Sequence, residues 1–172
     1  NMALDTNAIT SSMAGAGSPW KPALQRGLIG GSAASILSTV ALAAFGKRES
    51  GSIYAPTNAV SHWLYGDKAA LQNKPTLRYT LTGYAIHHAS ATFWAVLAER
   101  LLGKLLDRKE PLTTLEVALA SSAVACFTDY QLTPKRLHPG YEKRLSRPAL
   151  AVVYGAFGLG LFAGALLSRR DT

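Results

Sequence analysis

The stretch PALAVVYGAFGLGLFAGALLS, residues 148–168, contains no charged side chain and is rich in leucine, alanine and glycine. A helix needs about 20 mostly apolar residues to cross a bilayer, because the hydrocarbon core is roughly 30 Å thick and each helical residue rises about 1.5 Å. Residues 27–45, 79–98 and 113–130 have a similar apolar character. The sequence therefore predicts four membrane-spanning helices.

The overall composition agrees with a membrane protein. Only 16% of the 172 residues are charged, against about 25% in typical soluble domains. Four long apolar segments would leave too little polar surface to cover a soluble helical bundle. We therefore predict an all-α fold, a single membrane domain over residues 1–172 that forms an integral membrane four-helix bundle. The expected location is multi-pass in a membrane, such as the bacterial inner membrane.

The net charge of +8 comes from basic residues that lie between the apolar segments. Loops of this kind are attracted to anionic lipid headgroups, and no basic helix interleaved with aromatic residues points to nucleic acid. We therefore expect membrane lipids, and not nucleic acid, as partners. The two sides carry similar numbers of basic residues, so the orientation stays open.

The N-terminal segment, residues 1–22, is polar and rich in small residues. It lacks the basic start and short apolar core of a cleaved signal peptide. We expect this tail to be flexible or to lie at the membrane interface, where Trp20 and Lys21 would suit it.

Small residues recur at four-residue spacing in two of the predicted spans. Gly160 and Gly164 form one such ladder, and Gly27 and Gly31 form another. Small side chains let helix backbones approach closely in lipid. These faces can pack within the chain or against another molecule, so a homo-oligomer or a membrane-protein partner through Gly160/Gly164 and Gly27/Gly31 remains open.

The connection between the first two spans, residues 46–78, is too long for a simple turn. It contains Pro56 near a helix start, Asn58 as a possible N-cap, apolar residues at helical spacing, and Pro75 as a stop. We predict a short amphipathic helix that lies at the membrane interface.

Two adjacent histidines, His87 and His88, interrupt the span over residues 79–98. A charged side chain inside a span costs about 2.5–3.5 kcal/mol on insertion scales, so ionisable groups there normally face the bundle interior. The predicted topology places them on the same side of the membrane as His62 and Asp129. The candidate ligand-binding residues on that side are Asn58, His62, Trp63, His87, His88, Asp129, Arg136 and Glu142.

Imidazole and carboxylate groups are ligands for zinc, iron or manganese, so His62, His87, His88 and Asp129 form a candidate metal site. The sequence has no metal-binding spacing such as H-E-x-x-H, and haem is less expected than a metal ion because both intramembrane histidines lie on one helix. Two other readings stay open. The histidines either bond to nearby backbone and to the hydroxyls of Ser35, Ser38, Ser90 and Ser121, or they line a polar cavity for a lipid headgroup, a quinone or a transported ion.

The functional hypothesis is a small multi-pass membrane protein whose His/Asp site, near one membrane face, binds a metal ion or a small polar ligand. The alternative is a non-catalytic membrane interaction or assembly subunit with structural histidines. No hydrolase triad and no phosphate-binding glycine loop can be recognised, so catalytic residues are not assigned and enzymatic activity stays open.

Overall fold

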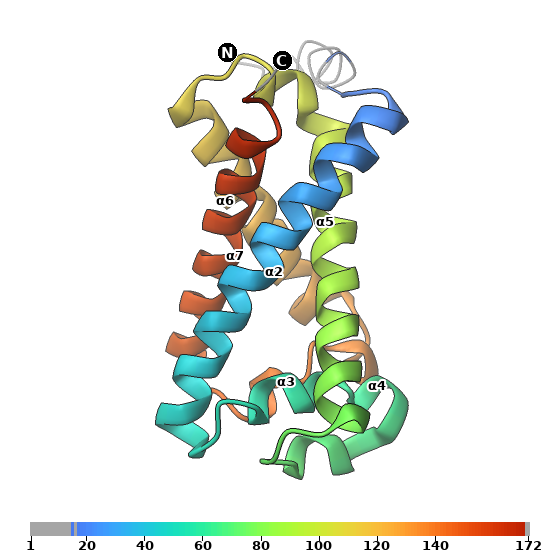
Figure 1. Cartoon of the computed structure of the whole chain (residues 1–172), viewed down its shortest axis with the longest axis vertical. Helices are drawn as coiled ribbons and strands as arrows, with labels where there is room; N and C mark the ends of the chain where they lie inside the picture. The colour runs from blue at the N-terminus through green and yellow to red at the C-terminus, as the bar shows by residue number, and fades with distance from the viewer. Residues whose placement is uncertain (1–14, 16, 171–172) are drawn as a thin grey trace, which may run out of the picture.

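The computed structural model describes residue 15 and residues 17–170, and the regular elements in this part of the chain are all helices, without a strand. The predicted all-α class is therefore confirmed. Helices α2, α5, α6 and α7 run along the length of the molecule, and α2 begins at the end where α7 finishes (Figure 1). The elements are α2 (Trp20–Ser50), α3 (Ala55–Val60), α4 (His62–Tyr65), η1 (Gly66–Leu71), η2 (Leu77–Leu81), α5 (Thr82–Leu106), α6 (Pro111–Phe127), η3 (Thr128–Leu132), η4 (Lys135–Leu137), η5 (Tyr141–Lys143) and α7 (Arg147–Leu167).

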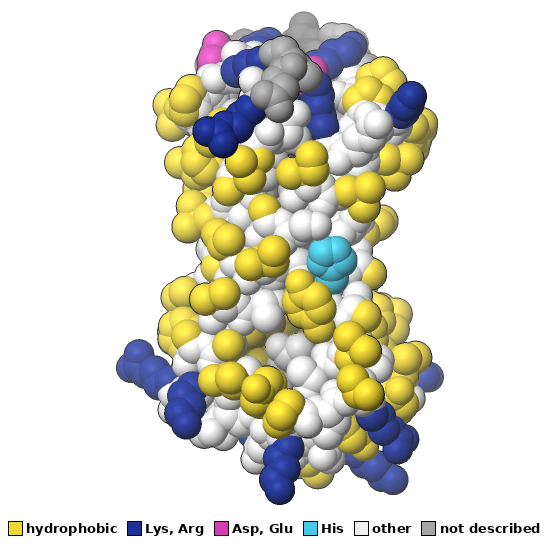
Figure 2. All heavy atoms as spheres, in the orientation of Figure 1, with side chains coloured by type: hydrophobic (Ala, Val, Ile, Leu, Met, Phe, Trp, Pro, Cys, Tyr) yellow, Lys and Arg dark blue, Asp and Glu magenta, His cyan; other side chains and the backbone are white. Residues whose placement is uncertain are grey.

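Three helices of the described chain are long and apolar enough to cross a membrane, and this allows a membrane location. They are α2, the helix Pro111–Leu132 that joins α6 to η3, and α7. Helix α5, which carries His87 and His88, is not among them. Figure 2 shows hydrophobic side chains over the middle of one face, with Lys and Arg gathered toward the two ends.

The glycine ladders are used within the chain. A Cβ atom on Gly160 would collide with the backbone of Ala34 in α2, and one on Gly27 would collide with Val96 in α5. Gly164 and Gly31 make equally close approaches to α2 and α5. Both faces that the sequence offered to a second copy or a partner are thus occupied by helices of the same chain.

The first connection differs from the single interfacial helix that was predicted. It contains the short elements α3, α4 and η1. All six residues of α3 are buried, so α3 is inserted between α2 and α5 and is not an amphipathic surface helix. Two glycines let α3 approach the neighbouring helices closely. A Cβ on Gly46 at the end of α2 would lie 2.6 Å from Pro56, and a Cβ on Gly83 at the start of α5 would collide with the carbonyl of Thr57.

The predicted role of Asn58 as an N-cap is wrong, because α3 begins earlier, at Ala55, after Tyr54 as the N-cap. Asn58 is fully buried inside α3. Its side-chain amide donates to the carbonyl oxygens of Gln72 and Lys74, each at 3.0 Å, and its oxygen accepts from Thr80 at 2.6 Å. Asn58 therefore holds the segment from Gln72 to Thr80 against α3.

The substitution Asn58→Asp is expected to destabilise the protein, because it replaces the amide donor with an oxygen that faces two carbonyl oxygens. Each buried group left without its hydrogen bond costs about 1–3 kcal/mol. Thermal unfolding in detergent is the measurement. Asn73→Asp is the control, since Asn73 is exposed and its side-chain oxygen only accepts, from Arg144 at 2.7 Å. Equal melting temperatures for the two variants would contradict this role.

Part of the predicted N-terminal tail, residues 1–14 and residue 16, lies outside the described residues. Residues 17–20 of this segment pack against α5, so this part is not a free tail. The Ser18 amide donates to the carbonyl of Arg100 at 3.1 Å, and Ser18 is buried. The Arg100 guanidinium lies over the Trp20 ring, 5.1 Å from its centre.

Candidate ligand-binding cavity

A cavity of about 480 Å³ lies inside the bundle, toward the end that contains α3. Helices α2 and α5 lie close together near the start of α2 and diverge toward α3 (Figure 1). Side chains from α2, α5, η3 and α7 form its walls, and residues of α3, α4 and the segment 133–141 close that end. A cavity of this size suits a small organic molecule.

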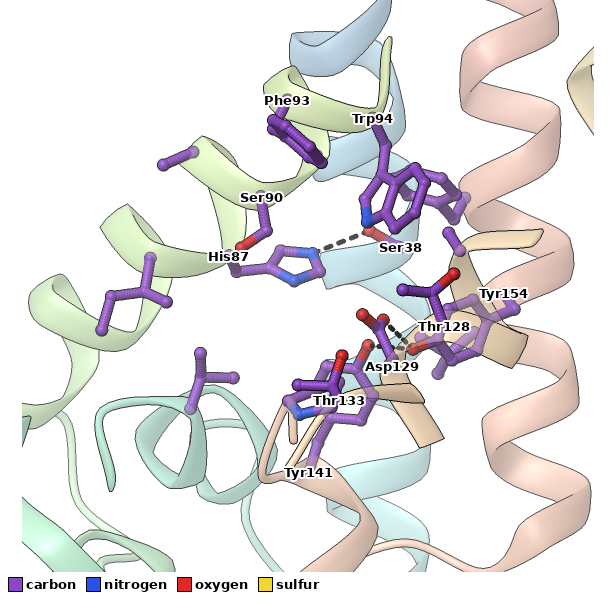
Figure 3. A pocket seen from close by; sticks show the side chains of 18 of the residues that line it. Ser38, His87, Ser90, Phe93, Trp94, Thr128, Asp129, Thr133, Tyr141 and Tyr154 are labelled. Carbon is purple, nitrogen blue, oxygen red and sulfur yellow. Dashed lines mark hydrogen bonds between the residues drawn. The ribbon is translucent and has the colours of Figure 1, made fainter. Parts of the chain in front are cut away.

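One polar wall is formed by His87 of α5, which is 8% exposed and lines the cavity. Its Nε2 atom lies 2.9 Å from the hydroxyl oxygen of Ser38 in α2 (Figure 3). The Ser38 hydroxyl donates its own proton to the carbonyl of Ala34 at 2.7 Å, so it accepts the hydrogen bond from His87. This assigns the proton of a neutral imidazole to Nε2 and leaves Nδ1 as an acceptor.

The opposite polar wall is a chain of hydrogen bonds that ends on Asp129 of η3. The Tyr141 hydroxyl donates to the Tyr154 hydroxyl at 3.3 Å, and Tyr154 donates to Asp129 Oδ2 at 2.6 Å. Burial raises the pKa of Tyr141, so its phenol keeps the proton that it donates. The second carboxylate oxygen, Oδ1, receives no hydrogen bond from the described residues. Figure 3 shows His87 and Asp129 pointing into the same space from different helices.

The rest of the wall is mainly apolar. Aromatic rings contribute much of it, and no lysine or arginine is among the described residues that line the cavity. Three apolar lining residues are also exposed at the surface, namely Ala89, Phe93 and Leu137. The cavity therefore opens on an apolar flank of the bundle, beside α5 and η4.

The eight predicted ligand-binding residues separate into two groups. Trp63, His87 and Asp129 line the cavity. The other five, Asn58, His62, His88, Arg136 and Glu142, do not.

Asn58 is buried inside α3, and the other four residues have different environments. His62 is buried and its Nε2 lies 2.8 Å from the carbonyl of His138. His88 projects away from the cavity beside Tyr84, and its Nδ1 is buried without a hydrogen-bond partner in the described chain. Arg136 is exposed on η4, and Glu142 accepts from the amide of Gly140 at 2.7 Å.

The predicted metal ligands do not form a site. Within the part of the chain that the structure describes, no group of three or more His, Cys, Asp or Glu residues could hold a metal ion. The physical reason is geometric, because His87 and His88 are neighbours that project about 100° apart around α5, and His62 faces the His138 carbonyl. The expectation that His62, His87, His88 and Asp129 share one ion is therefore not supported.

Sequence reasoning did not single out Trp94, Tyr141 or Tyr154 as parts of this site. Tyr154 gave a usable signal, since a phenol in an uncharged span must find a hydrogen-bond partner. Ser38 is one of the serines whose hydroxyls are expected to bond to the histidines, and this expectation is confirmed for His87. Its pairing with His87 arises only from the crossing of α2 and α5.

Comparisons of the chain with models of protein families, with curated proteins and with solved structures found no match. The cavity and the residues around it are therefore the features of the molecule that bear on its function.

Proposed function

We propose that this is a membrane-embedded binding protein whose cavity receives a small amphiphilic molecule from the lipid phase. The observation that carries the proposal is the cavity of about 480 Å³, with a polar cluster at one end and an opening on an apolar flank. The location belongs to the same proposal, as a multi-pass protein of a membrane such as the bacterial inner membrane.

In this proposal α5 is the fourth span. It packs alongside α2 over closely spaced glycine contacts and joins the end of the first connection to the start of α6. If α2, α6 and α7 cross the bilayer, α5 must return the chain between them. Its position in the bundle also turns His87 toward the cavity, where its polar atoms are shielded from lipid.

The opening suits entry from the bilayer. Phe93 is 60% exposed and Leu137 is 43% exposed, yet both line the cavity. In a soluble environment such an apolar rim would be costly, whereas acyl chains solvate it well. The mouth would therefore admit the apolar part of a lipid-dissolved molecule.

The distribution of polar groups would orient that molecule. His87, Asp129 and Tyr154 place hydrogen-bonding atoms in one region of the wall, and Phe93 and Trp94 lie further along α5. Six or seven helical residues correspond to about 9–10 Å of rise. A ligand with a polar head would contact His87 and Asp129, and its apolar tail would extend along α5 toward Phe93 and Trp94.

The alternative function, a non-catalytic interaction or assembly subunit, drew on the glycine faces. Those faces are occupied by α2 and α5 of the same chain, so the cavity is the better-supported feature.

Quenching of tryptophan fluorescence by 11-bromoundecan-1-ol tests the proposal in detergent solution. Of the three tryptophans, Trp63 and Trp94 line the cavity. In a Trp20→Phe background, only these two indoles fluoresce. We expect saturable quenching, because bromine quenches at contact and the number of sites is limited.

A matched pair of variants locates the binding. Ala89→Phe places a ring at the cavity mouth, whereas Ala85→Phe places one at an exposed position one turn away that does not line the cavity. We expect Ala89→Phe to weaken binding at least tenfold and Ala85→Phe to leave it unchanged. Quenching that rises linearly with the alcohol, or that responds equally to both substitutions, would refute the proposed function.

A further inference from the structure

We propose that the ligand of the cavity is a lipophilic organic cation, held with its positive charge at Asp129. This inference rests on the proposed function and names the class of molecule that the cavity takes. It follows from the charge of the wall, the free oxygen of Asp129 and the aromatic rings around it.

The lining of the cavity contains an acidic side chain and no basic one from Lys or Arg among the described residues. Among the described residues that line the cavity, Asp129 is the one Asp, Glu, Lys or Arg. An anionic head such as a phosphate or a carboxylate would meet a carboxylate and no basic group. A neutral head would not compensate the charge of an ionised carboxylate, which is costly in an apolar region. A cation resolves both problems.

The second step is the direction of the carboxylate. Tyr154 occupies Oδ2 from α7, and Tyr141 supports Tyr154 from the loop before that helix. Oδ1 keeps its accepting capacity, and a carboxylate whose second oxygen faces a cavity is a site for a positive charge.

The basic side chains on this side of the molecule do not replace such a ligand. Arg136 lies on η4 with its side chain exposed. The ring of His138 bonds through Nε2 to the carbonyl of Thr133 at 3.1 Å, and its Nδ1 lies 3.9 Å from Glu142. His87, on the facing wall, directs its Nε2–H to Ser38. Each neighbour that could carry a positive charge is thus engaged elsewhere or exposed.

The third step is the aromatic lining. Trp63, Phe93, Trp94, Tyr141, Tyr154 and Phe157 contribute rings to the wall. The faces of aromatic rings attract cations within about 6 Å, most strongly where water is excluded. One carboxylate among several aromatic rings is an arrangement that favours ammonium groups bearing apolar substituents over metal ions, which need several oxygen, nitrogen or sulfur ligands.

The experiment compares three probes of equal chain length in the fluorescence assay described above. They are 11-bromoundecyl-trimethylammonium, 11-bromoundecan-1-ol and 11-bromoundecanoate at a pH where the acid is ionised. For the unmodified cavity, we expect the cation to bind at least tenfold more tightly than the alcohol, and the anion to give no saturable quenching.

Variants then assign the preference to Asp129. Asp129→Asn is expected to lower the affinity for the cation at least tenfold and to leave that for the alcohol unchanged. Asp67→Asn is the control, because Asp67 lies in η1 on the same side of the molecule, is exposed and does not line the cavity. If Asp129→Asn does not fold, the ratio of cation to alcohol affinity in the unmodified cavity still decides the question.

The outcomes separate this inference from the proposed function. Saturable binding of alcohol and cation with equal affinity, or a preference for the anion, overturns the cation assignment and leaves the binding cavity standing. Saturable quenching by none of the three probes overturns both.

Discussion

Replacing Gly160 with alanine is expected to lower the melting temperature of the protein markedly, whereas Gly155→Ala on the same helix should not lower it. A Cβ on Gly160 would collide with the Cα of Ala34 and would lie 2.7 Å from the Ala33 carbonyl oxygen. These are backbone atoms, so α7 and α2 must separate to admit the methyl group. Overpacking of this kind costs about 1–3 kcal/mol or more.

The control separates packing from helix propensity. A Cβ on Gly155 would meet no atom of another element within 4 Å, and alanine is favoured over glycine inside a helix by about 0.8–1.0 kcal/mol. Gly155→Ala should therefore be neutral or slightly stabilising. The measurement is the midpoint of thermal unfolding in dodecyl maltoside. A Gly160→Ala variant as stable as Gly155→Ala would show that α2 and α7 do not pack at this distance.

The same glycines show how far the sequence could predict the packing. The four-residue spacing of Gly160 and Gly164 indicated a close helix contact, and the contact exists. The spacing could not indicate the partner, because α2 presents two small-residue faces. One face receives α7 at Ala34, and the other receives α5 at Gly27. Which helix takes which face depends on the whole bundle, and no local pattern encodes it.

The candidate site was predicted in part for a similar reason. The order of the spans placed His87 and Asp129 on one side of the membrane, and both line the cavity. His88 was grouped with them, but its azimuth on α5 turns it away. The prediction of Asn58 as a helix cap is wrong because α3 begins before it and is buried. This burial depends on close approaches at Gly46 and Gly83, which the residues around Asn58 do not indicate.

A second large effect is expected at the other end of the bundle, where Arg169 and Glu99 form an ion pair and are each 5% exposed. Two guanidinium nitrogens of Arg169 donate to the two oxygens of Glu99 at 2.8 and 2.7 Å. A third donates to Asp107 at 2.9 Å, and Asp107 also accepts from Arg26 at 2.6 Å. This network joins α2, α5 and the end of α7.

The charges in this network depend on one another. Burial disfavours the charged guanidinium, but the hydrogen bonds and charges of Glu99 and Asp107 outweigh it and raise the pKa of Arg169. The Arg169 guanidinium therefore keeps its positive charge. A paired arginine and carboxylate with this two-pronged geometry forms strong hydrogen bonds.

Arg169→Met is expected to destabilise the protein by about 3–5 kcal/mol, the typical effect of removing one partner from a buried ion pair. The methionine fills space but leaves the Glu99 carboxylate buried without its counter-charge. Arg170→Met is the matched control, because Arg170 is adjacent and exposed, and such surface changes usually stay within about 0.5 kcal/mol. Titration with SDS in mixed micelles measures the free energy of unfolding.

The double variant Glu99→Leu/Arg169→Met distinguishes the ion pair from the space it fills. If the cost of Arg169→Met comes from the unpaired carboxylate, removing Glu99 as well should restore much of the lost stability, because two apolar side chains in place of a buried pair are often tolerated. If the arginine instead acts mainly through Asp107, the double variant should be no more stable than Arg169→Met. Additive losses from the two single variants would contradict the coupling of these residues across α5 and α7.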